Sequence, residues 1–273
     1  MNHSSTMTVT GSGTPVVALH SSMSSKSQWS RLFERLAPHY KCIATDLSGY
    51  GKAPFPHNPE DFSLHDEAAM VDDAIVKAIG KNTPFHLIGH SYGGGTALRL
   101  AVEQPRRILS LALYEPTPFC LLEENGHERK EIQVIIDTVA RTTAIDARMA
   151  TRIFIDYWNG AGSFDAFPAE RQQAMVQRID KANLDFRALI TEPVTLRECG
   201  DLNLPVCLIA GHASPAPARR IVTLLHAALP NAIRYDIDAG HMGPITHADE
   251  VNKLLAVFID HHERQYFPIA SGF

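Results

Sequence analysis

Residues 85–101 read FHLIGHSYGGGTALRLA, and this stretch decides the fold of the chain. The apolar run 85–88 predicts a buried strand, and the run after Gly93 predicts the start of a helix. Between them, the pentapeptide Gly89-His90-Ser91-Tyr92-Gly93 has the Gly-x-Ser-x-Gly pattern of a nucleophile elbow. Small flanking residues allow a sharp turn that leaves the serine exposed above the sheet. The helix behind it directs backbone N–H groups at developing negative charge, so Ser91 is the predicted nucleophile.

The composition is typical of a globular enzyme. The chain has 273 residues, 45% hydrophobic and 20% charged, with a net charge of −5. The two signs are interspersed, so no basic face is expected to attract nucleic acid or anionic lipid. Residues 1–13 are polar, and no stretch is long enough to span a membrane. The cysteines show neither metal-binding nor disulfide spacing, which predicts free thiols, no metal site and a cytoplasmic location. They are Cys42, Cys120, Cys199 and Cys207.

Short apolar runs alternate with helical patterns along most of the chain. This alternation predicts an α/β fold with a mostly parallel, doubly wound sheet. The predicted strands are 15–20, 42–46, 85–89, 109–114, 206–210 and 233–237. The predicted helices of the same unit are 64–79, 92–103, 218–228 and 248–260.

The alternation stops after Pro116 and resumes after Val194. Three helical patterns fill the interval, near 128–144, 146–158 and 169–190. An insertion of this length favours a helical cap over the carboxyl ends of the strands, where ligands bind in open α/β sheets. The alternative is that these helices only pack on one face of the sheet. The predicted division is a first core segment 1–116, a cap 117–195 and a second core segment 196–273.

Four motifs, in this order, resemble those of the α/β-hydrolases with a helical cap. Residues 16–20 (VVALH) followed by Trp29 resemble the family's first-strand segment, and residues 46–53 (DLSGYGKA) resemble its Asp-x-x-Gly-x-Gly turn. The serine elbow comes third. Gly240-His241 resembles the late Gly-His pair that supplies the base. The resemblance covers about 14–116 and 196–265 as core.

The resemblance implies the roles of the first two catalytic residues. His241 is expected to act as general base toward Ser91 and then as general acid toward the leaving group. Haloalkane dehalogenases and epoxide hydrolases carry aspartate at the elbow, so a serine there favours acyl transfer.

The third member of the triad departs from the family pattern. After the strand 206–210 the family has Gly-x-x-Asp, but here Ser214 takes the place of the aspartate. One interpretation is that the acid has moved to Glu115, at the carboxyl end of the strand after the nucleophile strand. The other is that Glu115 is structural and the chain has lost part of the hydrolase apparatus. Asp238 is a further candidate, although it lies only three residues before His241.

The oxyanion hole is also expected from the family alignment. It implies backbone N–H donors at Ser22 and Tyr92, while Ser21 stands where the family has glycine and would be strained at a positive φ. Met23 is expected to share this role or to line the pocket. The aromatic pair Tyr157 and Trp158 is predicted to wall the pocket from the cap.

The combined features predict a serine hydrolase that cleaves a small to medium, largely apolar ester through an acyl-enzyme. Amides, lactones, thioesters and carbon–carbon bonds use the same apparatus and stay open. The alternative is a catalytically weak module that binds a small apolar ligand, because fold alone does not settle function. No cofactor is expected, the expected partner is a small-molecule substrate, and the oligomeric state is left open.

Overall fold

Seven strands form one sheet in the order β1-β3-β2-β4-β5-β6-β7 in the computed structural model, which describes residues 6–266. β1 pairs antiparallel with β3 at the edge, and the other neighbouring strands pair in parallel. The strands are β1 (Met7–Thr10), β2 (Thr14–Leu19), β3 (Tyr40–Thr45), β4 (Phe85–His90), β5 (Ile108–Tyr114), β6 (Val206–Gly211) and β7 (Ala232–Ile237). The predicted fold class is therefore confirmed.

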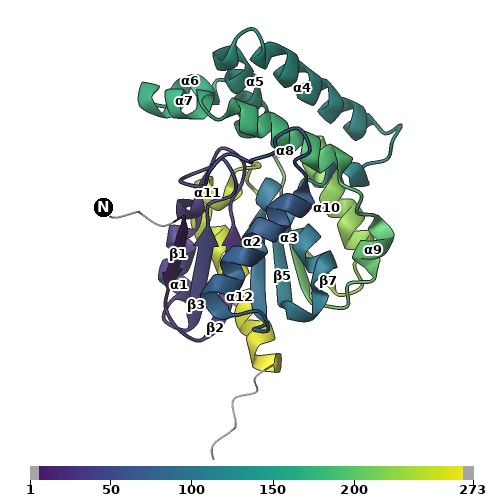
Figure 1. The fold of residues 1–273 in the computed structure, drawn as a ribbon. Coiled ribbons are helices and arrows are strands. Elements are labelled where there is room, and N and C mark those ends of the chain that lie inside the picture. The colour runs from purple at the N-terminus through teal and green to yellow at the C-terminus, as the bar shows by residue number, and fades with distance from the viewer. Residues whose placement is uncertain (1–5, 267–273) are drawn as a thin grey trace, which may run out of the picture.

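Helices cover both faces of this sheet (Figure 1). One face packs against α2 (Leu64–Ile79), α3 (Tyr92–Glu103) and α10 (Ala216–Ala228), and the other against α1 (Ser30–Leu36) and α12 (Ala248–Tyr266). The strands are apolar throughout because both faces are buried. The short helical segments of the same unit are η1 (Lys26–Trp29), η2 (Pro105–Arg107), η3 (Phe119–Leu121), α9 (Leu196–Gly200) and α11 (Gly243–Thr246).

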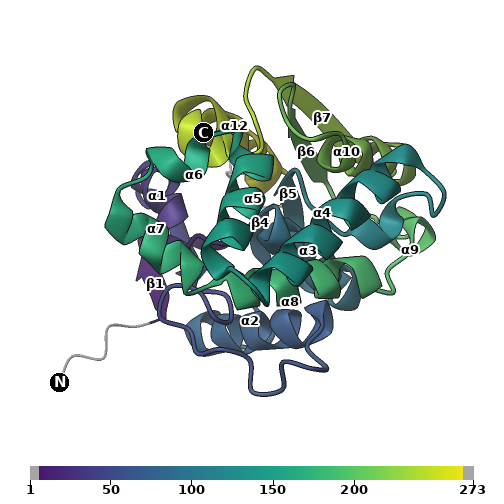
Figure 2. The same ribbon diagram turned by 90° about the horizontal axis from the view of Figure 1, so that it is seen from above.

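The segment between β5 and β6 forms a separate group of helices, here called the helical layer. It consists of α4 (His127–Thr143), α5 (Ala147–Asn159), α6 (Ser163–Ala166), α7 (Ala169–Val176) and α8 (Ile179–Thr191). Figures 1 and 2 show this layer over the carboxyl ends of the strands. α8 packs against α3 and η3 of the core, and α4 packs against α10, so the layer contacts the core through these two helices.

The structure differs from the predicted elements in two informative places. β1 was not predicted, because it is a four-residue edge strand whose side chains are largely exposed. The predicted helix 169–190 is two helices, which meet at Gln177 and Arg178. An unbroken helix of that length would run about 33 Å, whereas the turn lets both Met175 of α7 and Phe186 of α8 reach the buried core. No helix within residues 6–266 combines the length and apolar character needed to cross a membrane.

Candidate active site

Ser91 sits on a sharp turn between β4 and α3. Its φ is 56°, a left-handed value that is rare for a residue with a side chain. The turn forces close packing, since a Cβ on Gly93 would lie 2.3 Å from the carbonyl oxygen of His20. Only glycine fits there, which explains the second glycine of the pentapeptide. The side chain of Ser91 is thereby held at the carboxyl edge of the sheet.

Ser91, His241 and Glu115 form one hydrogen-bonded chain. His241 Nε2 lies 2.8 Å from Ser91 Oγ, and its Nδ1 lies 2.6 Å from Glu115 Oε2. All three residues are buried. With Nδ1–H donating to the carboxylate, Nε2 is left as the acceptor for the serine proton, which is the arrangement that a nucleophile and general base require.

Glu115 reaches His241 because of the strand register. β4 and β5 pair His90 with Tyr114, so the residues that follow them, Ser91 and Glu115, leave the sheet side by side. Glu115 has a φ of 41°, and its second carboxylate oxygen accepts a 2.6 Å bond from the Gly211 amide. The carboxylate is therefore fixed at both oxygens.

The other two candidate positions do not contact His241. The Oγ atom of Ser214 is buried without a hydrogen-bond partner among the described residues. Asp238 is exposed to solvent. Of the acid positions considered from the sequence, the structure brings only Glu115 to the imidazole.

Two residues hold His241 from other directions. Its carbonyl oxygen accepts a 2.8 Å hydrogen bond from His90 Nε2, from the residue before the nucleophile. The indole of Trp158, from α5 of the helical layer, packs on the imidazole with ring centroids 4.3 Å apart. The orientation of the base is thus restricted by both the core and the helical layer.

The loop after β2, residues 20–25, lies opposite His241 and is called the β2 loop. Its residue Ser22 and the first residue of α3, Tyr92, have amide N–H groups without an acceptor among residues 6–266. The first amides of a helix lack intrahelical acceptors, so the Tyr92 N–H is available to a ligand. Such a pair of donors can bind an oxyanion.

The positive φ in the β2 loop falls on Met23, at 60°, and not on Ser21. Ser21 instead donates from both its amide and its hydroxyl to Gln28 Oε1, each at 3.1 Å. Within residues 6–266, Met23, Ser91 and Glu115 are the non-glycine residues with positive φ, and all three lie at this site. Clustering of strained residues is typical of functional sites.

Burial keeps two histidines of the site neutral. Desolvation lowers the pKa of His20 to about 4 and that of His90 well below its usual range. The hydrogen-bond partners of His20 define its tautomer. Nε2 of His20 accepts from the Leu47 amide, so its Nδ1–H donates to the Ser21 carbonyl. These histidines fix loops, and neither faces Ser91 Oγ as His241 does.

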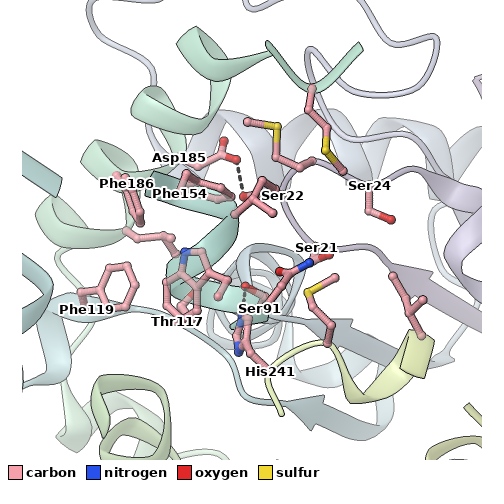
Figure 3. A pocket seen from close by; sticks show the side chains of 18 of the residues that line it. Ser21, Ser22, Ser24, Ser91, Thr117, Phe119, Phe154, Asp185, Phe186 and His241 are labelled. Carbon is pink, nitrogen blue, oxygen red and sulfur yellow. Dashed lines mark hydrogen bonds between the residues drawn. The ribbon is translucent and has the colours of Figure 1, made fainter. Parts of the chain in front are cut away.

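A pocket lies between Ser91 and the helical layer (Figure 3). Its cavity volume is about 50 Å³. Most of its wall is apolar. The main apolar residues are Phe119, Phe154, Trp158, Met175, Phe186 and Leu189.

The structure supports two of the three predicted pocket residues by position and corrects the third. Met23 and Trp158 line the pocket. Tyr157 does not, because consecutive residues of a helix point about 100° apart. Its hydroxyl instead donates to Glu131 of α4, at 2.9 Å.

Several polar residues at the site were not predicted from the sequence. Gln28 and His90 connect the β2 loop to the His241 loop, with Gln28 Nε2 3.1 Å from His90 Nδ1. Thr117 lines the pocket with its hydroxyl buried and unpartnered among the described residues. Asp185, also in the pocket wall, belongs to a charged cluster with Lys181. The only signal for that pair was its i,i+4 spacing, which usually marks an exposed helix face.

Comparisons with known proteins agree with this geometry. Residues 14–146 match the family model described as the alpha/beta hydrolase fold. A fluoroacetate dehalogenase from a Burkholderia species is 34% identical over 119 residues, 42% of this chain and 39% of that protein. The chain therefore spans about two fifths of this relative. A pimeloyl-(acyl-carrier protein) methyl ester esterase of Aliivibrio fischeri is 25% identical over 92% of this chain and 96% of its own length.

Solved structures share the whole architecture. The enol-lactonase from Burkholderia xenovorans superimposes with a TM-score of 0.74, covering 93% of this chain and 95% of that one at 20% identity. A likeness at that identity shows the fold. Together with the match of residues 14–146 to the family model, it shows that the chain has the α/β-hydrolase fold.

Proposed function

We propose that the protein is a serine hydrolase that cleaves small, largely apolar acyl substrates, esters first among them. The observation that carries the proposal is the continuous hydrogen-bonded chain from Ser91 Oγ through His241 to Glu115. In a buried site with an adjacent pair of free amides, this arrangement has every part that acyl transfer needs.

The reaction follows from the positions of these groups. Ser91 Oγ attacks the carbonyl carbon while His241 Nε2 takes its proton, and the oxyanion accepts hydrogen bonds from the Ser22 and Tyr92 amides. The Glu115 carboxylate stabilises the imidazolium that forms. His241 then protonates the leaving alcohol, which departs and leaves the acyl group on Ser91. A water molecule, deprotonated by His241, releases the acid and restores the serine.

The proposed substrate class rests on the pocket and on the relatives. The mainly apolar wall fits an apolar acyl group. The Aliivibrio protein is named a methyl ester esterase, and the Burkholderia structure an enol-lactonase, both of which cleave acyl–oxygen bonds. A dehalogenase reaction is a weaker fit, because the aspartate nucleophile of the dehalogenases is replaced by Ser91.

Intact-mass analysis after treatment with a fluorophosphonate tests the nucleophile. The wild type should gain one adduct per chain, and Ser91→Ala should gain none. Turnover of p-nitrophenyl esters should then be highest for acetate to hexanoate and fall steeply for longer chains. A folded wild type that forms no adduct would overturn the proposal in favour of a ligand-binding module.

Two further proposals accompany the enzymatic one. The helical layer is proposed to act as the cap that closes the site, since α5 and α8 supply much of the pocket wall. The four free cysteines are consistent with a reducing compartment, and the cytoplasm is the proposed location. Cell fractionation with an antibody against the chain tests the second point.

A further inference from the structure

A buried ionic cluster lies between α8 and the core, beside the two amides that face the reacting carbonyl. Its charged members are Lys181 and Asp185 of α8 and Glu67 of α2, each at most 1% exposed. Figure 3 shows Asp185 across the pocket from Ser91, bonded to Ser22. The mechanism proposed above gives these three residues no role.

Each donor of the lysine has an acceptor. The ammonium group donates to Asp185 Oδ1, to Tyr92 Oη at 3.3 Å and to Glu67 Oε2 at 3.4 Å. A lysine ammonium group has three N–H donors, so every donor of Lys181 is hydrogen-bonded. The Tyr92 hydroxyl in turn donates to Glu67 Oε2 at 2.7 Å. Burial raises the pKa of Tyr92 well above its usual value, which keeps this hydroxyl protonated as a donor.

The carboxylate of Asp185 extends the cluster to the β2 loop. Its Oδ2 atom accepts from Ser22 Oγ at 2.5 Å and from Tyr50 Oη at 2.6 Å. The two residues whose amides form the proposed oxyanion hole, Ser22 and Tyr92, are therefore both tied by their side-chain hydroxyls to groups that Lys181 holds together.

The surroundings are shaped to hold the lysine. Its ammonium lies 4.4 to 5.0 Å from the ring centroids of Tyr92, Phe62 and Tyr50, where cation–π attraction is favourable. The stem passes so close to Gly49 that a Cβ there would lie 2.9 Å from Lys181 Cγ. The glycine of the Asp-x-x-Gly turn thus leaves the space that Lys181 occupies.

Stability alone is a weak reason for this arrangement. Burying three charged groups carries a large desolvation cost, and well-packed apolar residues of similar size are often equally stable. A position beside both oxyanion donors supplies a second reason, because catalysis depends on donors that are fixed before the charge develops.

We infer that Lys181 is a positioning residue for the oxyanion hole: docking of α8 on the core fixes the Ser22 and Tyr92 amides through Asp185 and Glu67. The inference rests on the proposed serine-hydrolase function. It also means that the hole is complete only while the helical layer is seated on the core.

Steady-state kinetics with p-nitrophenyl butyrate tests this inference. Lys181→Met keeps the length of the stem and removes the charge, and kcat should fall about 10- to 100-fold with KM changed less than threefold. The loss is expected to stay below the 10²–10³-fold cost of deleting an oxyanion donor, because the amides are displaced but present. Affinity for a short aliphatic trifluoromethyl ketone, whose adduct carries an oxyanion, should weaken by a similar factor.

Milder variants keep the test decisive if Lys181→Met fails to fold. Tyr92→Phe and Ser22→Ala each remove one hydroxyl tie and retain the backbone amide, and each should lower kcat about 3- to 10-fold with the same loss of ketone affinity. Glu192→Gln is the matched control. It removes a buried carboxylate that joins the end of α8 to Arg99 of α3 at 2.7 Å, away from the hole, so it should lower the melting temperature and leave kcat within twofold.

The outcomes separate the two levels of the proposal. If the variants lose only thermal stability and keep kcat and ketone affinity within twofold, Lys181 does not position the hole, although the enzyme is a serine hydrolase. If the wild type itself forms no fluorophosphonate adduct, the proposed function fails before this question arises.

Discussion

On the base side of Ser91, formed by His241 and Glu115, the hydrogen bonds come from loops of the sheet alone. On the oxyanion side, formed by Ser22 and Tyr92, they extend into α8 of the helical layer. The geometry of the base side is set by strand register. The parallel strands β4 and β5 end at the same edge of the sheet, so the residues that follow them, Ser91 and Glu115, lie close together. The oxyanion side requires two segments that lie far apart in the sequence, the β2 loop with α3 and the helix α8, to meet. The hydrogen bonds for proton transfer thus lie within the core, although Trp158 of the helical layer packs on the base. The hydrogen bonds that position the oxyanion donors cross the contact between the core and the helical layer.

The largest expected effect breaks the base side. In Glu115→Gln the amide can still accept the Gly211 N–H, but its NH₂ group faces His241 Nδ1 and selects the tautomer that carries its proton on Nε2. That tautomer cannot accept the serine proton, so kcat should fall by roughly 10³–10⁴-fold, as it does when a triad aspartate becomes asparagine. Hydrolysis of p-nitrophenyl butyrate measures it.

Asp238→Asn is the control for this change and should retain activity within twofold, since Asp238 is exposed. A loss of less than tenfold in Glu115→Gln would mean that Glu115 is only structural. The base side would then not depend on a Ser91–His241–Glu115 triad, and the contrast with the oxyanion side would not hold.

The next effect concerns acid stability on the oxyanion side. His20 joins the β2 loop to Leu47, and burial lowers its pKa from 6.5 to about 4. The unfolded chain therefore binds a proton that the folded chain excludes in that interval. The stabilisation from neutral His20 is full above pH 6.5 and is lost as the pH falls toward 4, by up to about 3 kcal/mol.

Urea unfolding between pH 7.5 and pH 4 measures this dependence. His20→Asn cannot titrate in the interval, so its free energy of unfolding should fall less with acid than that of the wild type. The exposed residue His57 supplies the control, and His57→Gln should keep the wild-type slope. Equal slopes in wild type and His20→Asn would show that the β2 loop is not the acid-sensitive part.

The smallest expected effect comes from Ser214, and it tests whether this residue takes part in the base side. Ser214 occupies the position of the family's aspartate, yet its buried hydroxyl has no partner within residues 6–266. Ser214→Ala removes a desolvated polar group, so stability should stay the same or rise by about 1 kcal/mol, and kcat/KM should remain within twofold. A tenfold loss in kcat/KM would reveal a part for this hydroxyl in the reaction.

Sequence patterns predicted the parts of this molecule that depend on local order. The strands of the parallel core were placed within two residues of their observed bounds, because buried strands are short apolar runs with clear ends. The elbow pattern predicted Ser91, and the family resemblance implied His241 as its base. Glu115 was one of two interpretations that the sequence left open for the acid.

What escaped prediction depends on tertiary contacts. Lys181 and Asp185 have the spacing of a surface ion pair, and only the docking of α8 on Gly49 and Tyr92 turns that face inward. Tyr157 and Trp158 look equivalent as neighbours, but the rotation of α5 sends one to Glu131 and the other to the pocket. The unexpected strand β1 is exposed and short, so it lacks an apolar pattern.

The position of Lys181 has a consequence for recombining proteins that share this fold. The helical layer lies between β5 and β6, so an exchange of this layer between two proteins would be joined near residues 117 and 195. Such a chimaera would keep Ser91, His241 and Glu115 from one parent and receive the residue at position 181 from the other. The core would retain Glu67, Tyr92 and Gly49, but it would lack the Lys181 ammonium group that these residues surround. Successful exchanges should therefore be those that transfer Glu67 and Gly49 together with α8.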